Sequence, residues 1–101
     1  MLLYHVTYHA DRILAEGFHD STGWHCQAHE LWSGVWLESR PNQQQGPGTR
    51  TLVVDLPEDV VAGYEHVHLE RNLPYREFIV PAEVVNRHAR PSEVGPAAAS
   101  A

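Results

Sequence analysis

The sequence contains no lysine and a single cysteine, Cys26. Its seven basic side chains are therefore all arginines, against 13 acidic ones, and the formal net charge is -6. A lone cysteine excludes an internal disulfide and is typical of a reducing compartment. The acidic balance argues against a nucleic-acid backbone as partner, because phosphates are held by clustered basic residues.

Long apolar runs are also missing from the chain. No segment is apolar over the roughly 20 residues that a membrane-spanning helix requires, and no basic stretch followed by an apolar one opens the sequence. We therefore expect no membrane partner and a cytoplasmic protein. The 101 residues, 43% of them apolar, suit one small domain with a modest core.

The first 18 residues predict a strand followed directly by a helix. Residues 2–6 are mostly apolar and predict the strand. Ala10 and Ile13 have helical spacing, and Thr7 precedes them as a capping residue. Gly17 is expected to end the helix in a left-handed turn.

The rest of the chain predicts short elements. Residues 19–33 and 40–50 are rich in polar and turn-forming residues and predict loops. Residues 82–89 fit either a last strand or a helical turn, and residues 91–101 predict a disordered tail, which leaves one domain over residues 1–90. This order predicts an α+β domain with a mainly antiparallel sheet and one principal helix. The remaining predicted elements are strands at 34–39, 51–57, 65–70 and 75–81 and a short helix or turn at 57–64.

Three short fragments occur in a telling order: YHVT at 4–7, GVWL at 34–37 and REFIVP at 76–81. Together with the intervening ILAEGF, they resemble the diphtheria-toxin and poly-ADP-ribose-polymerase branch of the ADP-ribosyltransferases. That family carries a histidine near the end of its first strand, an aromatic residue in a later strand, and a glutamate that opens another. The resemblance extends over residues 3–88. It implies small split antiparallel sheets with NAD bound in the cleft between them.

The resemblance implies a role for each matching residue. His5 would donate to the adenosine-ribose hydroxyl of NAD, the Val6 backbone would pair with the nicotinamide amide, and Thr7 would lie near a ribose hydroxyl. Trp36 would stack on the nicotinamide ring. Glu77 would bond the nicotinamide-ribose hydroxyl and stabilise the sugar cation as nicotinamide leaves. The implied function is transfer of ADP-ribose from NAD to an unidentified acceptor, whether protein, nucleic acid or small molecule.

Arginines are the candidates for holding the NAD pyrophosphate. Arg40 follows Ser39, near the predicted strand of Trp36, and both are candidate NAD contacts. Arg12 and Arg50 are rivals for the same role, and each of the three could equally be an ordinary surface arginine.

The chain departs from the family pattern beside the predicted nicotinamide pocket. Val6 stands where the family usually has glycine directly after the histidine, and Trp36 replaces the common tyrosine. Tyr64 and Tyr75 are candidates for the second aromatic ring that would sandwich the nicotinamide.

The chemistry of the proposed glutamate agrees with its place in the sequence. Strand alternation puts Glu77 on the face of Tyr75 and Ile79, opposite Phe78 and Val80. A carboxylate on an apolar face is costly unless it lies in a cleft or is paired, for example with an arginine. In a cleft it would stabilise the positive charge that builds on C1′ as the N-glycosidic bond breaks. It could also act as a base toward an acceptor hydroxyl.

The eight histidines raise the possibility of a metal site. His25, Cys26 and His29 form a loose cluster, and His66 and His68 share a face of one predicted strand. Zinc sites require three or four ligands in fixed geometry, whereas two histidines on a strand are more typical of a solvated face. We expect no metal site.

Other functions and simpler structural roles are compatible with the same residues. His5 could be a strand-end histidine bonded to a backbone carbonyl, and Trp36 a core residue. The fold could serve as a non-catalytic nucleotide-binding or protein-interaction module. A small regulatory protein acting through its surface is a further alternative, for which an acidic charge and exposed Trp24 and Trp32 would be the signs.

Overall fold

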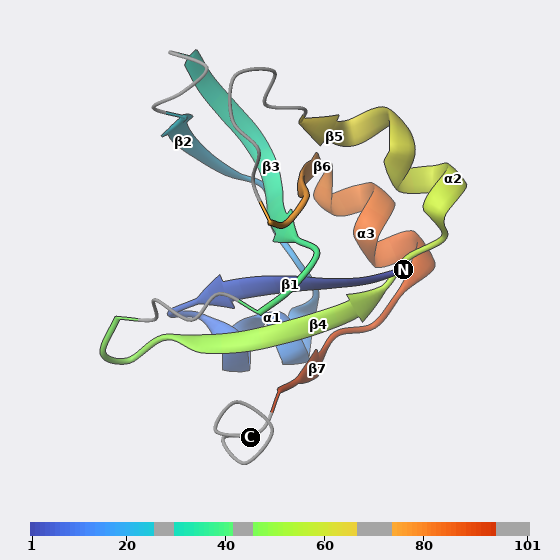
Figure 1. Cartoon of the computed structure of the whole chain (residues 1–101). Coiled ribbons are helices and arrows are strands. Elements are labelled where there is room, and N and C mark those ends of the chain that lie inside the picture. Colours follow the sequence, from blue (N-terminus) through green and yellow to red (C-terminus); the bar gives the residue numbers. More distant parts are fainter. Residues whose placement is uncertain (26–29, 42–45, 67–73, 95–101) are drawn as a thin grey trace.

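The computed structural model describes residues 1–25, 30–41, 46–66 and 74–94. Within these ranges the chain forms an antiparallel sheet with three α-helices and one short 3-10 helix (Figure 1). The α+β class is confirmed. The strands are β1 (Leu2–Thr7), β2 (Ser21–His25), β3 (Glu30–Glu38), β4 (Arg50–Asp55), β5 (Glu65–His66), β6 (Glu77–Val80) and β7 (Ser92–Glu93). The helices are α1 (Ala10–Glu16), α2 (Glu58–Val61), the 3-10 turn η1 (Ala62–Tyr64) and α3 (Ala82–His88).

The sheet divides beside its first strand. The strand order is β5-β6-β3-β1-β4-β7, and β2 pairs additionally with β3. β1 pairs with β4 along its whole length, but with β3 only where Tyr4 lies opposite Glu38. Figure 1 shows β3 leaving β1 and β4 at a steep angle. Two groups of strands, β1-β4-β7 and β2-β3-β5-β6, therefore diverge from this one junction.

One apolar core joins the two groups of strands. Strand alternation directs Leu3 of β1 and alternate side chains of β4, β6 and the second half of β3 toward it, and the helices cover it with their apolar faces. Burying these side chains is the main source of stability for so small a domain. The core residues are Leu3, Ala10, Ile13, Phe18, Val35, Leu37, Leu52, Val54, Leu56, Val61, Phe78, Val80, Ala82 and Val85.

Helix α1 begins and ends close to where the sequence predicts. The Thr7 hydroxyl accepts a hydrogen bond from the His9 N–H at 2.9 Å, so it closes the turn before the helix rather than capping a helical N–H. Gly17 ends the helix with a φ of +88°, and Phe18, which follows it, is buried in the core. The Asn86 amide of α3 bonds both the N–H and the carbonyl of Phe18, each at 2.9 Å.

Residues 82–89, which fit a strand or a helical turn, form helix α3. Pro81 precedes its first turn, and the Asp20 carboxylate accepts a hydrogen bond from the Ala82 N–H at 2.8 Å. Because α3 is as long as α1, the prediction of one principal helix is wrong. The predicted short helix or turn at 57–64 is confirmed as α2 and η1.

The prediction of a loop over residues 19–33 is wrong. β2 occupies residues 21–25, and β3 begins at Glu30 instead of residue 34, so the two form an antiparallel hairpin. Partner pairing, rather than the intrinsic preference of the polar β2 sequence, explains these strands.

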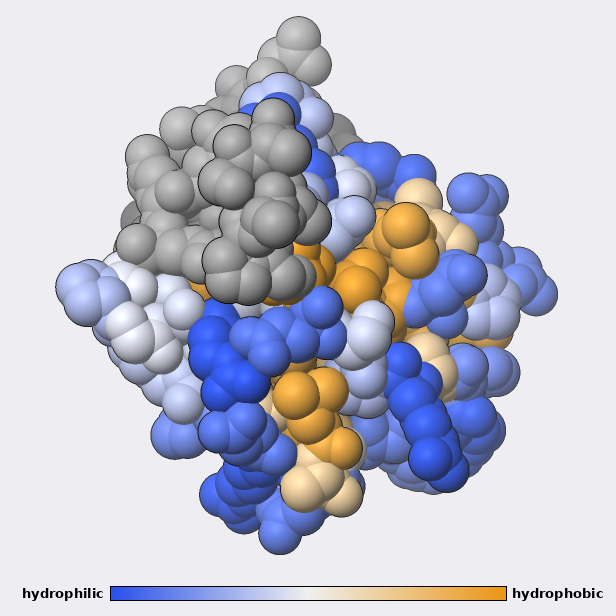
Figure 2. Space-filling model, turned by 90° about the horizontal axis from the view of Figure 1, so that it is seen from below, coloured by the Kyte–Doolittle hydropathy of each residue, from blue (hydrophilic) through white to orange (hydrophobic). Residues whose placement is uncertain are grey.

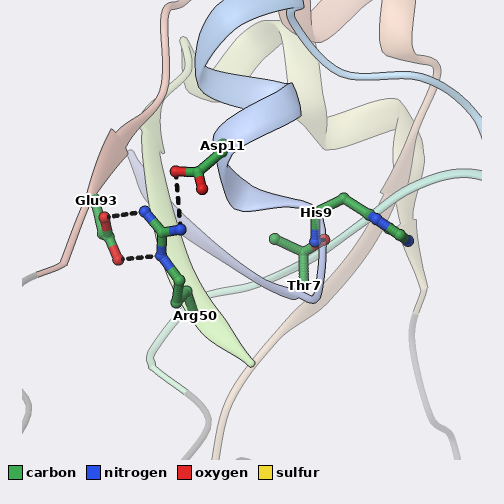
Figure 3. A network of polar contacts seen from close by, with 5 residues as sticks. All are labelled: Thr7, His9, Asp11, Arg50 and Glu93. Carbon is green, nitrogen blue, oxygen red and sulfur yellow. Dashed lines mark hydrogen bonds and ion pairs between the residues drawn. The ribbon is translucent and has the colours of Figure 1, made fainter. Parts of the chain in front are cut away.

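The predicted tail also begins too early. Ser92 and Glu93 form β7 and pair with β4. Arg50 of β4 donates two hydrogen bonds of 2.7 Å to the Glu93 carboxylate and one of 2.8 Å to Asp11 of α1 (Figure 3). These contacts tie the last described strand to the sheet and to the first helix.

The surface is dominated by polar side chains. Among the described residues, no helix is both long enough and apolar enough to cross a membrane. Seen from below the view of Figure 1, apolar areas are separated by hydrophilic ones (Figure 2). The large apolar side chains exposed at the described surface are Leu2, Tyr8, Leu14, Leu31 and Tyr64.

Candidate functional site

A hollow of about 230 Å³, here called the first hollow, lies where β1, β3 and β6 come together. It adjoins the single Tyr4–Glu38 pairing from which the strands diverge. Three segments far apart in the sequence contribute its walls. Four of the predicted NAD contacts are among its lining residues, which are Tyr4, His5, Val6, Trp36, Leu37, Glu38, Glu77, Phe78 and Ile79.

Strand alternation explains how Trp36 and Glu77 reach the first hollow. On β6, Phe78 and Val80 are buried in the core, which leaves Glu77 and Ile79 on the opposite face, as predicted. β3 pairs with β6 so that Trp36 lies opposite Ile79. The indole and the carboxylate therefore share one face of the sheet.

His5 bridges β1 and β3 just beyond their single pairing. Its Nδ1 lies 2.8 Å from the carbonyl oxygen of Trp36, and its ring meets Phe18 edge-on with centroids 5.4 Å apart. A carbonyl oxygen can only accept, so Nδ1 carries the proton. Burial lowers the pKa of His5, and the hydrogen bond to Trp36 opposes this only in part. The ring is therefore neutral at pH 7, and its Nε2 is a hydrogen-bond acceptor.

Mild acid is expected to destabilise the fold partly through His5. Because burial lowers the folded-state pKa of His5, the unfolded chain binds this proton more tightly. Its contribution to stability is then lost as the pH falls below about 6.5, the value of a free histidine. We expect the melting temperature of His5→Gln to fall less between pH 7.5 and pH 5 than that of the wild type. His88→Gln, at an exposed position of α3, is the control. An equal fall of the melting temperature in all three proteins would contradict this role of His5.

The Trp36 ring is held by the β2-β3 hairpin. A methyl group at Gly23 of β2 would lie 3.2 Å from Cζ2 of Trp36, so the indole packs over the Gly23 backbone. The ring centroids of Trp32 and Trp36 lie 6.1 Å apart. The Trp32 ring also meets the His66 ring edge-on, with centroids 4.2 Å apart. Trp32 is therefore half-buried, so it does not supply the exposed side chain that the alternative of a surface-acting regulatory protein would require. These contacts orient Trp36 as a fixed wall of the first hollow.

Glu77 faces a second carboxylate across the sheet. Glu38 lies directly opposite it on β3, and both line the first hollow. Burial raises the pKa of Glu38, the neighbouring charge of Glu77 raises it further, and Arg40 acts in the opposite direction. Glu38 is not among the site residues predicted from the sequence. Alternation within GVWLES places it on the face of Trp36, but the register with β6 is needed to bring it to Glu77.

A second hollow, of about 350 Å³, adjoins the first and shares His5 and Val6 with it. Of the three candidate arginines, Arg12 lines this hollow; its ion pair with Glu16 is exposed and therefore weak. Arg50 instead binds Glu93 and Asp11 and lines neither hollow. The other residues lining the second hollow are Thr7, Tyr8, His9, Ile13, Phe18, His19, Asp20 and Ser21.

Three predicted NAD contacts are not among the lining residues of either hollow. The Ser39 hydroxyl accepts a hydrogen bond from the Arg76 N–H at 2.8 Å, so it fixes the start of β6. The Arg40 guanidinium lies over the Tyr75 ring, 5.5 Å from its centre. Ser39 therefore has a supporting role, and Arg40 and Tyr75 contact one another without lining either hollow. Tyr64 lines a third, open hollow, which Trp32 also lines and which shares Ile79 with the first hollow.

Possible metal ligands do not gather within the described ranges. In residues 1–25, 30–41, 46–66 and 74–94, no three His, Cys, Asp or Glu side chains are placed to hold a metal ion. His66 packs against Trp32. The side chain of His25, and Cys26, His29 and His68, lie outside what the structure describes.

Comparison of the chain with models of protein families, with curated proteins and with solved structures finds no match. The chemistry of the two hollows is therefore the basis for assigning a function.

Proposed function

We propose that this chain is an ADP-ribosyltransferase-like domain that binds NAD and transfers its ADP-ribose to an acceptor. One observation carries the proposal. His5, Trp36 and Glu77, selected from three distant fragments of the sequence, line a single hollow. That hollow lies where two groups of strands diverge, which agrees with the cleft between small sheets that the family resemblance implies.

The two adjoining hollows suit the two ends of a dinucleotide. The nicotinamide ring would lie against Trp36 in the first hollow, because a flat ring packs well on an indole. The rest of NAD would pass His5 and Val6, which line both hollows, into the second. There Arg12 is the described arginine best placed to bind the diphosphate. Together the hollows fall in the size range of cofactor sites.

The neutral His5 ring changes the direction of one predicted hydrogen bond. Its Nδ1–H is already donated to the Trp36 carbonyl. The free Nε2 would therefore accept a hydrogen bond from a ribose hydroxyl, instead of donating one. The same hydrogen bond to the carbonyl holds the His5 ring in place before NAD binds. The ring therefore does not have to be ordered when NAD binds.

Glu77 would act at the bond that breaks. As the bond between C1′ and the pyridine nitrogen opens, its electron pair leaves with nicotinamide, and positive charge builds on C1′. A fixed carboxylate beside the sugar lowers this barrier electrostatically. The acceptor oxygen then forms the new bond to C1′ and loses its proton to a base.

The test incubates the whole chain with NAD and measures free nicotinamide, with titration calorimetry for NAD in parallel. We expect NAD to bind and nicotinamide to be released in proportion to enzyme and time. A chain that neither binds NAD nor releases nicotinamide would overturn the proposal.

One observation favours a second function, a nucleotide-binding module without catalysis. Val6 places a side chain at the wall of both hollows, where the family usually has glycine. A valine there would hinder the close approach of the nicotinamide to β1. Calorimetric binding of NAD without any release of nicotinamide would identify this alternative.

A further inference from the structure

We propose that Glu38 is a second catalytic carboxylate, which takes the proton from the acceptor while Glu77 stabilises the sugar cation. This inference rests on the proposed NAD-cleaving function. Nothing in the family resemblance assigns a role to residue 38. The acceptor class is a hydroxyl group small enough to enter the first hollow, and water is the simplest member.

The register of the strands places Glu38 next to the position that an acceptor would occupy. It lies directly opposite Glu77 on β6 and directly opposite Tyr4 on β1. Side chains opposed in this way have Cβ atoms about 5 Å apart and share one face of the sheet. Both carboxylates line the first hollow. An atom that attacks a sugar held by Glu77 is therefore within reach of Glu38.

The carboxylates of Glu77 and Glu38 have different neighbouring side chains, which suits them to different roles. His66 on β5 lies opposite Glu77 on its other side, so Tyr4, Glu38, Glu77 and His66 form one row across four strands. Glu38 stands between Glu77 and Tyr4, with Arg40 near it in sequence, and His5 is the other titratable group of β1 that lines the same hollow. Two carboxyl groups with different surroundings are a common basis for a division of catalytic roles.

The arrangement is costly unless it serves a purpose. Like charges directly opposite one another in a sheet are destabilising, and Glu38 is also partly withdrawn from water, so burial and Glu77 both raise its pKa. A carboxylate with a raised pKa is a stronger base and better suited to accept a proton near neutral pH. Glutamine at position 38 would remove the repulsion and keep the shape, so the fold itself does not require the charge.

The proposed step balances as follows. The C1′–N bond breaks, and its electron pair leaves with nicotinamide. A lone pair of the acceptor oxygen forms the C1′–O bond, and the oxygen's proton passes to the Glu38 carboxylate. With water as acceptor, the products are nicotinamide, ADP-ribose and a protonated Glu38, which returns the proton to solvent.

The test compares the wild type with Glu38→Gln at saturating NAD, with water as acceptor and nicotinamide as readout. Glu83→Gln, at an exposed position on α3, is the matched control. We expect Glu38→Gln to release nicotinamide about a hundredfold more slowly, with an unchanged or tighter calorimetric Kd for NAD. The wild-type rate should fall with acid as Glu38 is protonated, and Glu38→Gln should lose this part of the pH dependence. The melting temperature of Glu38→Gln at pH 7 should equal or exceed that of the wild type.

Each contrary result has a separate meaning. A wild-type rate and an unchanged acid limb in Glu38→Gln would overturn the role of Glu38 and leave the proposed function standing. Loss of NAD binding with unchanged turnover would also overturn it, because it would make Glu38 a binding residue. Absence of nicotinamide release from the wild type would remove the proposed function itself, and the role of Glu38 with it.

Discussion

Replacing Glu77 by glutamine is expected to slow nicotinamide release from NAD by roughly a thousandfold, at the upper end of what one electrostatic contact to a transition state contributes. The reason is that glutamine keeps the size and hydrogen-bonding capacity of the side chain but removes the charge facing C1′. NAD binding should change little, because positive charge moves from the nicotinamide ring to C1′, beside Glu77, only as the bond breaks. The measurement is the rate of nicotinamide formation at saturating NAD, with the Kd from calorimetry.

Glu83→Gln again supplies the control, since Glu83 is an exposed glutamate paired with Arg87. It should retain the wild-type rate and Kd. Equal nicotinamide release by Glu77→Gln and the wild type would remove Glu77 from the chemistry. A Kd weakened as much as the rate would make Glu77 a ground-state binding residue instead.

Replacing Gly34 by alanine is expected to lower the free energy of unfolding by about 2–4 kcal/mol, and the melting temperature by on the order of 10–20 °C. Gly34 has a φ of +145°, a conformation that residues with a Cβ rarely adopt. An added Cβ would also lie 3.0 Å from Cγ2 of Ile79 and 3.1 Å from the carbonyl oxygen of Val80. β3 pairs with β2 up to and including Gly34, and with β6 after it.

Gly63→Ala is the matched control, because no atom lies within 4 Å of a Cβ built at that position. Thermal and urea unfolding of both variants provide the measurement. If Gly34→Ala were as stable as Gly63→Ala, the close contact between β3 and β6 beside the first hollow would be wrong. Because Ile79 lines that hollow, we also expect weaker NAD binding by any Gly34→Ala protein that still folds.

Local signals explain the parts of the fold that the sequence predicts. β1, α1 and its end at Gly17 follow from apolar spacing and a glycine, and β4 follows from a β-branched run. Alternation on β6 correctly separates Glu77 from the core. His5, Trp36 and Glu77 could be selected because the three fragments that contain them resemble, in order, those of one family.

Long-range contacts explain what the sequence does not predict. β2 is a polar segment that becomes a strand because β3 pairs with it. α3 is supported by Asp20 at its first turn and by Asn86 bonded to Phe18, contacts that span more than 60 residues. Glu38 is inconspicuous in the sequence because its position depends on the register of two strands about 40 residues apart.

The most direct test of the central claim is a crystal structure of the chain with a carbocyclic NAD analogue, whose nicotinamide cannot be released. We predict the nicotinamide ring against Trp36 in the first hollow. The adjoining ribose hydroxyls should lie beside Glu77, and His5 Nε2 should accept a hydrogen bond from the dinucleotide. A dinucleotide bound elsewhere, with the first hollow empty, would contradict the account.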